Sequence, residues 1–427
     1  GLGDVYKRQL REGFVTVALS WILMSVIGCL PFVINGDIPH FADALFEMIS
    51  GFTTTGATVV SDVEGLTKGS LFWRSFSHWI GGMGVLVFLL AIVPMAGGSH
   101  MNLMKAESPG PSVGKLVPKV RQTAKYLYII YFALTMIEVI FLLFGGMNLF
   151  EALTTSFGTA GTGGFAIWND GFVSVSPYNQ WVVTIFMLLF GVNFGFYFLI
   201  LTGKLRDALK FEEVRIYFII VIAAAVFIFI NLRHFALYAP AEGIRQAFFQ
   251  VASIITTTGF ASADFNLWPE TSRTILVLLM FIGACAGSTG GGIKVSRFII
   301  ACKSFIKEII SYLHPRSVKK IKIEGKPLEH ETLRATNVYF MTYMVIFAVS
   351  VLLVSIENKD LVTNFAAVAA TFNNIGPGLS LVGPMANFGH FTDFTKYILM
   401  FDMLAGRLEI FPMMLLFCPA VWKRRRA

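Results

Sequence analysis

The stretch TTTGFASADF, residues 256–265, lies between two long apolar runs, yet it holds three threonines and a glycine. A surface turn would favour Asn, Asp or Pro, and a continuous membrane helix would be apolar throughout. Three stretches of the same character occur elsewhere, and they are SGFTTTGATV (50–59), SFGTAGTGGFA (156–166) and TFNNIGPGLS (371–380). One glycine can be aligned in each, namely Gly56, Gly163, Gly259 and Gly376. The flanking segments keep the same order, which indicates four parallel repeats.

The composition is typical of an integral membrane protein. Of 427 residues, 55% are hydrophobic and 14% are charged, whereas soluble domains carry about 25% charged residues. Apolar runs such as 14–34 and 214–232 are long enough to cross a ~30 Å hydrocarbon layer as helices. We therefore expect a polytopic helical membrane protein rather than a barrel.

The net charge of +8 is gathered in blocks, while the alternate loops carry few basic residues. Lys and Arg concentrate at 7–11, 105–125, 204–215, 294–334 and 423–426. This distribution predicts that the blocks and both chain ends face the cytoplasm, and it argues against nucleic-acid binding. The four cysteines form no disulfide or zinc framework, and the seven histidines form no metal-ligand motif.

A short amphipathic segment precedes each aligned glycine. These segments cover 41–50, 149–156, 244–254 and 364–372, and helices of ~8–11 residues would cross only about half of a membrane. Each repeat is thus expected to be a full helix, a half helix, a non-helical return and a second full helix, which gives eight spans. Non-helical backbone at membrane depth is tolerated only where it is buried or lines a water-filled path.

This chemistry suits a potassium ion. Carbonyl and hydroxyl oxygens can replace a hydration shell without trapping the ion, and glycine reaches the positive φ that such a lining needs. The C-terminal ends of half helices add partial negative charge.

The motifs GFTTTGAT, AGTGGFA, TTTGFASADFN, NNIGPG, GACAGSTGGGIKVSRF, HWIGGMGV and MLAGRLEIF resemble the membrane subunit of the Trk/Ktr/HKT superfamily of potassium transporters. The similarity is greatest to the bacterial TrkH type and covers about residues 10–427. It implies an all-α fold of four pseudo-symmetric helix–pore-loop–helix repeats around a central pore. It also implies a filter that binds the transported K⁺, and no organic cofactor. The filter residues are Thr54, Thr55, Gly56; Gly161, Thr162, Gly163; Thr257, Thr258, Gly259; and Asn374, Ile375, Gly376.

The fourth repeat departs from the Thr-Gly pattern, as it often does in this family. Glycine at all four aligned positions is associated in the family with preference for potassium over sodium. We also expect Phe260 to brace its loop and Asp264 to lie at the outer mouth.

The expected organisation follows the repeats. Its boundaries are an N-terminal remnant at 1–12, repeat 1 at 13–97, a cytoplasmic loop at 98–125, repeat 2 at 126–203, a loop at 204–213, repeat 3 at 214–312, a loop at 313–334, and repeat 4 with a basic C-terminus at 335–427. Larger TrkH-type relatives have two further N-terminal helices, so this chain is expected to be a fragment or a shorter Ktr-like form. The loop motifs favour a truncated TrkH-like chain.

The stretch GSTGGG interrupts the second helix of repeat 3. Its residues are Gly287, Ser288, Thr289, Gly290, Gly291 and Gly292, and so many glycines disfavour a continuous helix. A phosphate-binding loop is disfavoured because Ile293 separates the last glycine from Lys294. A simple kink stays open, while the resemblance implies a flexible intramembrane gate below the filter.

Arg407 lies inside the last apolar run, where a charge is costly and usually has a partner or faces a cavity. Pairing with Glu409 and snorkelling are alternatives. The resemblance puts Arg407 in the cavity under the filter, near the gate.

Three further interpretations concern the surroundings of the pore. His78, beside Trp79, is interpreted as a membrane-interface anchor, and the glycines of HWIGGMG as close helix packing. The outer acidic residues are interpreted as ordinary loop charge rather than as a cation trap. These residues are Asp37, Asp43, Asp62, Glu64, Asp264 and Glu270.

The most favoured function is potassium uptake across a bacterial inner membrane, either down the gradient or coupled to protons or sodium. The resemblance implies a homodimer surrounded by membrane lipid, with one pore in each protomer. It also implies that the faces at 105–125 and 313–335 dock a cytoplasmic nucleotide-binding ring of the TrkA type. An alternating-access transporter would show inverted repeats around a charged site, and an enzyme would show converging acid, base or metal residues.

Overall fold

The computed structural model describes residues 2–84, 120–314, 320–328 and 330–422. The end of predicted repeat 1, residues 98–119 of the predicted first cytoplasmic loop, and the basic C-terminus at 423–427 lie outside this part. Within it the protein is helical except for one short antiparallel pair, β1 (Lys322–Ile323) and β2 (Lys326–Pro327).

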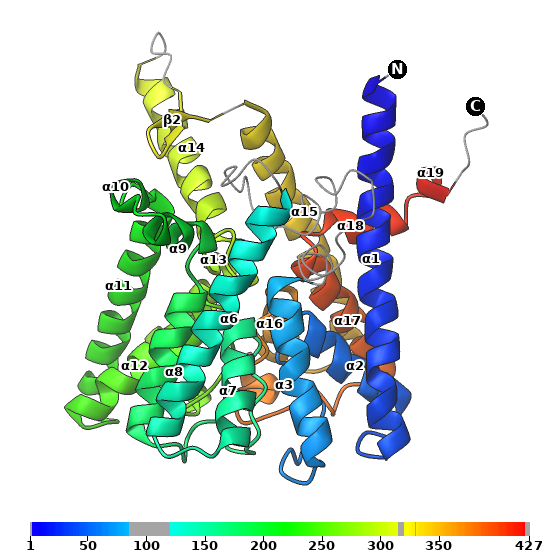
Figure 1. Cartoon of the computed structure of the whole chain (residues 1–427), viewed down its shortest axis with the longest axis vertical. Helices are drawn as coiled ribbons and strands as arrows, with labels where there is room; N and C mark the ends of the chain where they lie inside the picture. The colour runs from blue at the N-terminus through cyan, green and yellow to red at the C-terminus, as the bar shows by residue number, and fades with distance from the viewer. Residues whose placement is uncertain (1, 85–119, 315–319, 329, 423–427) are drawn as a thin grey trace.

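Four long helices enclose the bundle, and all four begin at the same end of the molecule (Figure 1). They are α1 (Leu2–Asn35), α6 (Val120–Phe144), α11 (Glu212–His234) and α15 (His330–Val354). Each is long and apolar enough to cross a membrane. A shared direction requires parallel repeats, as the sequence predicts, and disagrees with the inverted repeats of an alternating-access transporter.

A short pore helix follows each long helix. The four are α2 (Phe41–Phe52), α7 (Leu149–Gly161), α12 (Pro240–Ile255) and α16 (Leu361–Phe372), with 12 to 16 residues each. They are longer than expected. Helices α2 and α7 end later than predicted, α16 begins earlier, and α12 does both. Local signals set two of the starts: Asn148 and Glu151 form a reciprocal capping box on α7, and Asp360 caps α16.

After each pore helix the chain returns through a loop and a further helix. These returning helices are α3 (Lys68–Met83), α8 (Pro177–Phe190), α13 (Glu270–Ile282) and α17 (Asp393–Arg407). Fourfold repetition of long helix, pore helix, loop and returning helix is confirmed. Shorter elements complete the described part, namely α10 (Leu205–Ala208), η1 (Phe265–Leu267), η2 (Ser355–Glu357), η3 (Ser380–Val382) and α19 (Pro419–Trp422).

The expectation of an unbroken second span in repeats 2 and 4 is wrong. In repeat 2, α9 (Phe194–Leu201) leaves α8 at 89°. In repeat 4, positive φ at Glu409 and Ile410 ends α17 before α18 (Phe411–Leu416) begins. Repeat 3 also breaks, and the break at 283–294 contains the predicted interruption at 287–292 and is wider than it; α14 (Val295–Leu313) follows. All three breaks lie on the side of the pore loops nearer the end at which the long helices begin (Figure 1). We call this side inner and the opposite side outer, after the orientation that the sequence predicts.

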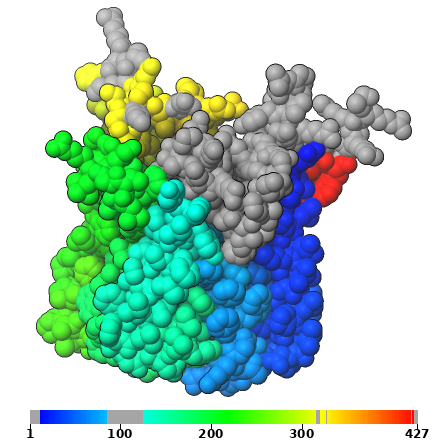
Figure 2. Space-filling view, in the orientation of Figure 1, coloured from blue at the N-terminus to red at the C-terminus, as the bar shows by residue number. Residues whose placement is uncertain are grey.

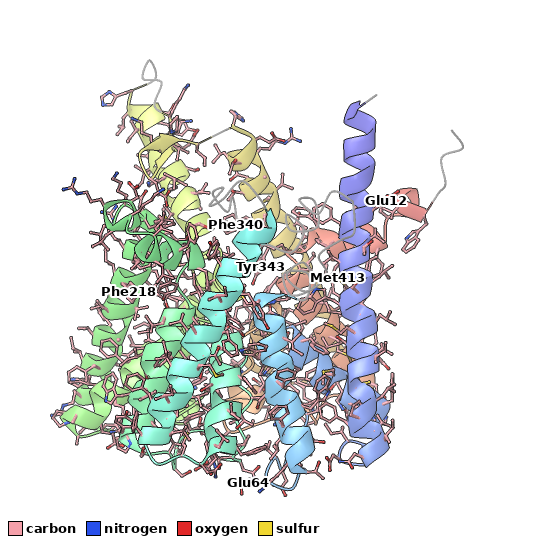
Figure 3. All side chains as sticks on the ribbon, in the orientation of Figure 1. Glu12, Glu64, Phe218, Phe340, Tyr343 and Met413 are labelled. Carbon is pink, nitrogen blue, oxygen red and sulfur yellow. The ribbon has the colours of Figure 1, made fainter. Side chains whose placement is uncertain are left out.

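The repeats follow one another around the bundle. On the face drawn in Figure 2, repeat 2 lies between repeats 1 and 3. Glu12 in α1 and Glu64 after the first pore loop lie toward opposite ends (Figure 3). Apolar side chains such as Ile140 and Phe141 of α6 are exposed at the perimeter, which suits a lipid-facing surface.

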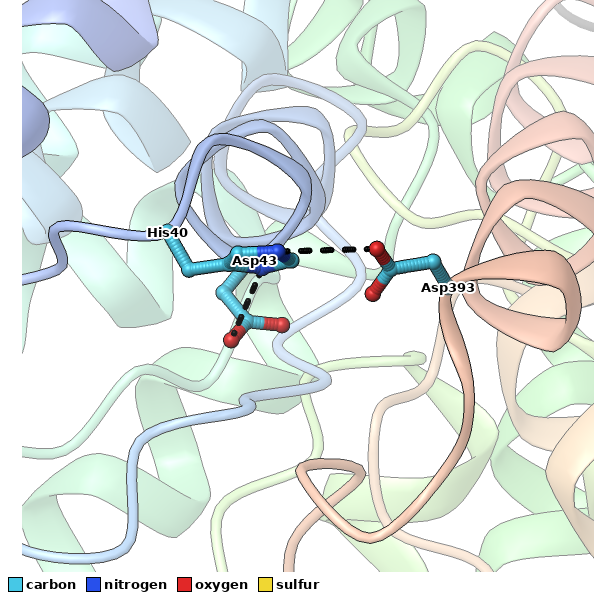
Figure 4. Close-up of side chains that lie close together, drawn as sticks. All are labelled: His40, Asp43 and Asp393. Atoms are coloured by element: carbon cyan, nitrogen blue, oxygen red, sulfur yellow. Dashed lines mark ion pairs between the residues drawn. The ribbon is translucent and has the colours of Figure 1, made fainter.

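Ion pairs join repeat 4 to repeat 1 at the outer end. Lys396 Nζ lies 2.5 Å from Asp43 Oδ1. The His40 ring lies between two carboxylates, 3.5 Å from Asp43 and 3.5 Å from Asp393 (Figure 4). These three side chains could approach a metal ion, but the Lys396 ammonium already neutralises Asp43 and the two ring nitrogens face different carboxylates. We therefore interpret the cluster as an ionic seam.

A buried ion pair fixes the loop that follows the first pore helix. Arg74 Nε lies 2.8 Å from Glu47 Oε1, and both side chains are almost fully buried. Glu47 also accepts hydrogen bonds from the Thr58 hydroxyl and the Val59 amide, while the Arg74 guanidinium lies 4.1 Å above the Phe165 ring of repeat 2. The pair thus joins α2, α3 and two pore loops.

We predict that Arg74→Met will strongly destabilise the protein, because it leaves the Glu47 carboxylate buried without its counter-charge. Such losses cost about 3–5 kcal/mol. Thermal unfolding of the detergent-solubilised protein checks this. Lys210→Met is the control, because its pair with Asp207 is exposed and exposed pairs contribute little. Equal melting temperatures for Arg74→Met and wild type would contradict the assignment.

Candidate functional site: a ring of four pore loops

The four pore loops share one unusual backbone conformation. Each has a non-glycine residue at positive φ, then an intervening residue, then a glycine at positive φ. The pairs are Thr54 (54°) and Gly56 (78°), Thr162 (55°) and Gly164 (74°), Thr257 (60°) and Gly259 (85°), and Asn374 (56°) and Gly376 (95°). Threonine rarely adopts this region, so tertiary contacts must hold the loops in place.

The loops close into a ring through glycine–carbonyl contacts. A Cβ on Gly56 would overlap the carbonyl oxygen of Gly163, and one on Gly164 would overlap that of Thr258. In the same way Gly259 lies against the carbonyl of Ile375, and Gly376 lies against that of Thr55. Each repeat therefore touches the next, and repeat 4 returns to repeat 1. A side chain at any ring glycine would push two loops apart.

This geometry corrects the alignment of repeat 2. Gly164, rather than Gly163, is equivalent to Gly56, and the ring triplet is Thr162, Gly163 and Gly164. Gly161 is the last residue of α7, where a Cβ would overlap the His78 carbonyl. The motif AGTGGFA offers three glycines, and composition alone did not say which one has the left-handed backbone.

Two polar atoms of the loops are buried without a partner. The Thr54 hydroxyl and the Asn374 side-chain oxygen are buried, and neither has a hydrogen-bond partner among the described residues. Both belong to the first left-handed residue of their triplets. A buried oxygen without a partner is costly unless an ion or water completes it. By contrast, Thr55 and Thr258 share hydrogen bonds with Thr53 and Thr256 at 2.8 and 2.7 Å.

His78 braces the ring, so its interpretation as an interface anchor is wrong. The side chain is fully buried. Its Nδ1 lies 2.7 Å from the Gly51 carbonyl, and its Nε2 accepts the Phe165 amide at 3.3 Å. These bonds specify a neutral ring with the proton on Nδ1, and they join pore loops 1 and 2. Phe260 is also buried and packs on Phe172, with ring centroids 4.5 Å apart.

A cavity of about 120 Å³ lies outside the ring, lined by loops of all four repeats. All four ring glycines reach it, and Arg74, paired to Glu47, is the one charged residue of its described lining. The outer acidic residues are not among its lining residues, and several of them have hydrogen-bond or ion-pair partners. For example, the Asn169 amide donates to Asp62 and lowers the pKa of that carboxyl. This supports the interpretation of these residues as ordinary loop charge.

The glycine-rich loop at 283–294 lies directly on the inner side of the ring. The Gly291 amide donates to the Thr257 hydroxyl at 2.6 Å. Cβ atoms on Gly290 and Gly291 would lie 2.9 and 2.8 Å from the carbonyl oxygens of Thr256 and Asn373. The Gly290 amide bonds to Ser288, so these amides do not form an open phosphate cradle. The loop thus presses on the inner ends of pore loops 3 and 4.

Arg407 binds this loop rather than Glu409. Its guanidinium donates to the Thr289 carbonyl at 2.8 Å and to the Gly82 carbonyl at 3.2 Å, and it also donates to the Gly81 carbonyl. Glu409 pairs instead with Arg297. One cation therefore connects the inner end of repeat 4 to the glycine-rich loop and to repeat 1, which agrees with the expected position of Arg407 beside the gate.

Sequence reasoning missed two buried cations. Lys294 and Arg297 were counted in a cytoplasmic basic block, but they are 2% and 8% exposed. The Lys294 ammonium donates to the Gly290 carbonyl, and the Arg297 guanidinium lies 3.9 Å above the Tyr339 ring. The nearby glycine run was the available signal, because it lets the chain turn back into the protein.

The parallel repeats and the oxygen-lined ring define a helical membrane protein built to pass ions. The comparisons agree. The family model for TrkH, described as a cation transport protein, matches residues 3–424, and the chain belongs to this family. Its members are transport proteins, so the enzyme alternative is rejected, and the chain is a multi-pass membrane protein.

Similar proteins cover almost the whole chain. It is 38% identical to the Trk system potassium uptake protein TrkH of Escherichia coli K12, over 97% of this chain and 86% of that protein. The corresponding Vibrio parahaemolyticus protein is also 38% identical, over 98% and 88%. The crystal structure of the potassium transporter TrkH from Vibrio parahaemolyticus superposes with a TM-score of 0.85 at 35% identity, over 97% and 86% of the two chains.

We predict that Gly259→Ala will disrupt the ring while Gly146→Ala will not. Both glycines have φ of 85°, so both variants carry the left-handed penalty of roughly 1–2 kcal/mol. A Cβ at 146 meets open space, whereas one at 259 meets Ile375 and Pro377. Rubidium flux in proteoliposomes, with thermal unfolding as a check on folding, tests this. Equal flux in the two variants would contradict the ring assignment.

Proposed function

We propose that the protein carries potassium ions into the cell through the ring of four pore loops. One observation carries the proposal: four left-handed glycines lie against four neighbouring carbonyls around one closed ring. Closely spaced carbonyl oxygens replace the hydration shell of a potassium ion. The names of the relatives, which describe potassium uptake proteins, support the same ion.

The proposed filter consists of the four ring triplets. They are Thr54–Gly56, Thr162–Gly164, Thr257–Gly259 and Asn374–Gly376. Gly161 is excluded because it lies inside α7. The C-terminal ends of the pore helices point toward the ring. The partial negative charges of these helix ends favour a cation there. In the outer cavity the one charged residue of the described lining, Arg74, is paired to Glu47. An ion can therefore reach the ring without first being bound strongly.

The proposed gate is the segment 287–292, held by Arg407. The segment contacts the inner ends of pore loops 3 and 4, and the Arg407 guanidinium adds a positive charge there. Both features oppose the passage of a cation until the segment moves. This arrangement favours a gated path over a simple kink.

We further propose that the chain works in a bacterial inner membrane, with the ring toward the outside and both ends toward the cytoplasm. The basic blocks support this orientation. A homodimer with one pore per protomer and a cytoplasmic nucleotide-binding ring of the TrkA type are proposed from the family resemblance. The predicted domain boundaries stay predictions.

Rubidium uptake tests the function. Purified protein in liposomes and potassium-starved cells that lack their own uptake systems should both accumulate rubidium, and excess potassium should compete better than excess sodium. The filter variant Gly259→Ala serves as the inactive control. Well-folded protein that moves no cation would refute the proposal.

We predict that Arg407→Ala will raise rubidium flux, because it removes both a cation and a hydrogen bond that holds the Thr289 carbonyl. Arg407→Lys should give an intermediate flux, since it keeps the charge but loses the multiple contacts. Initial uptake rates normalised to folded protein provide the measurement. Unchanged flux in a well-expressed Arg407→Ala protein would contradict the role.

A further inference from the structure

Both ends of the glycine-rich loop meet at one carboxylate. A single oxygen of Glu213 accepts the Ala286 amide at 2.7 Å and the Ser296 amide at 2.9 Å. Glu213 lies in the first turn of α11 and is 7% exposed. The two amides lie near the entry of the loop and just past its exit. Their shared acceptor closes the loop at its base, together with a backbone bond from the Val295 amide to the Ala284 carbonyl at 3.0 Å.

This carboxylate also completes helix α14. The helix begins after Lys294, which has φ of 84° and gives no side-chain cap. The Ser296 amide belongs to the first turn and needs an acceptor. Glu213 supplies it from another helix, and its negative charge suits a helix N-terminus.

Other contacts hold each end of the loop. The Cys285 amide donates to the Gly191 carbonyl, and the Phe194 amide donates to the Gly287 carbonyl, both at 3.0 Å. The Gly191 carbonyl and the Phe194 amide of these bonds lie at the bend between α8 and α9. Near the exit, the Lys294 ammonium donates to the Gly290 carbonyl within the loop itself. Arg297, just past the exit, pairs with Glu409 and stacks on Tyr339, so repeat 4 also holds this end. Glu213 is the contact that joins both ends of the loop to one side chain of α11.

We propose that Glu213 is a positioning residue that holds the loop in its pore-closing conformation, and that opening requires this contact to break. The proposal rests on the proposed function and specifies how its gate is regulated. Glu213 is the second residue of α11, and the segment 204–211 ends where this helix begins. A displacement of that cytoplasmic segment would act on both ends of the gate through one side chain.

Glu213→Gln tests the proposal, because it keeps the volume and removes the charge. Single-channel recording of the full-length protein in bilayers should show a roughly tenfold higher open probability, equivalent to about 1.4 kcal/mol. Unitary conductance and the potassium-to-sodium ratio should stay unchanged, because the ring is untouched. The matched control is Glu212→Gln, whose side chain pairs with Lys303 of α14 at 2.6 Å and not with the loop.

A second readout follows the loop directly. Ser288→Cys, in a protein with Cys302→Ser and Cys418→Ser, reports access of a charged thiol reagent from the cytoplasmic side. Reaction should be several-fold faster with Glu213→Gln and unchanged with Glu212→Gln. Should Glu213→Gln fail to fold, Glu213→Asp replaces it, because the shorter side chain draws the shared oxygen away from both amides.

The outcomes are distinct. Unchanged open probability and thiol access in a folded Glu213 variant, with a wild type that conducts potassium, would overturn the clamp and leave the function intact. A folded wild type that conducts no cation would refute the proposed function itself. An equal rise in both Glu variants would also overturn the clamp, because it would implicate general loosening between α11 and α14.

Discussion

The contact between a left-handed glycine of one repeat and a backbone carbonyl of the next is the constraint on which the structure depends. It occurs four times and closes on itself. Four loops can meet in this way only if all lie at one depth, which requires four pore helices inside the bundle. Backbone strain at three threonines and one asparagine persists because neighbouring loops leave no room to relax.

The backbone contacts of the ring occur once in each repeat, but the charged contacts around the ring do not. Glu47 and Arg74 fix the outer side of repeats 1 and 2, whereas Glu213 and Arg407 bind the glycine-rich loop on the inner side. Backbone oxygens can form a symmetric ring because every residue has one. A buried charge needs a specific partner, so each one joins a particular pair of elements.

This division suits a gated pore. Uncharged oxygens around the ring can hold a cation weakly enough to release it, and the one charged residue of the described outer lining has its partner. Unlike the ring, the glycine-rich loop belongs to one repeat, so it can move without dismantling the filter. Side chains of α11 and α17, which belong to different repeats, both bind it. A shift between repeats would therefore reach it.

The sequence by itself determined the membrane class, the four parallel repeats, the family and the glycine-rich break in repeat 3. These follow from composition, hydrophobic length and recurrent motifs, which are local properties. Tertiary structure alone decided that Gly164 completes the ring, that His78 is a buried brace, and that Lys294 turns inward. It also decided the bends after α8 and α17. Each of these depends on which atoms from distant segments compete for the same space, and neither periodicity nor charge counting contains that information.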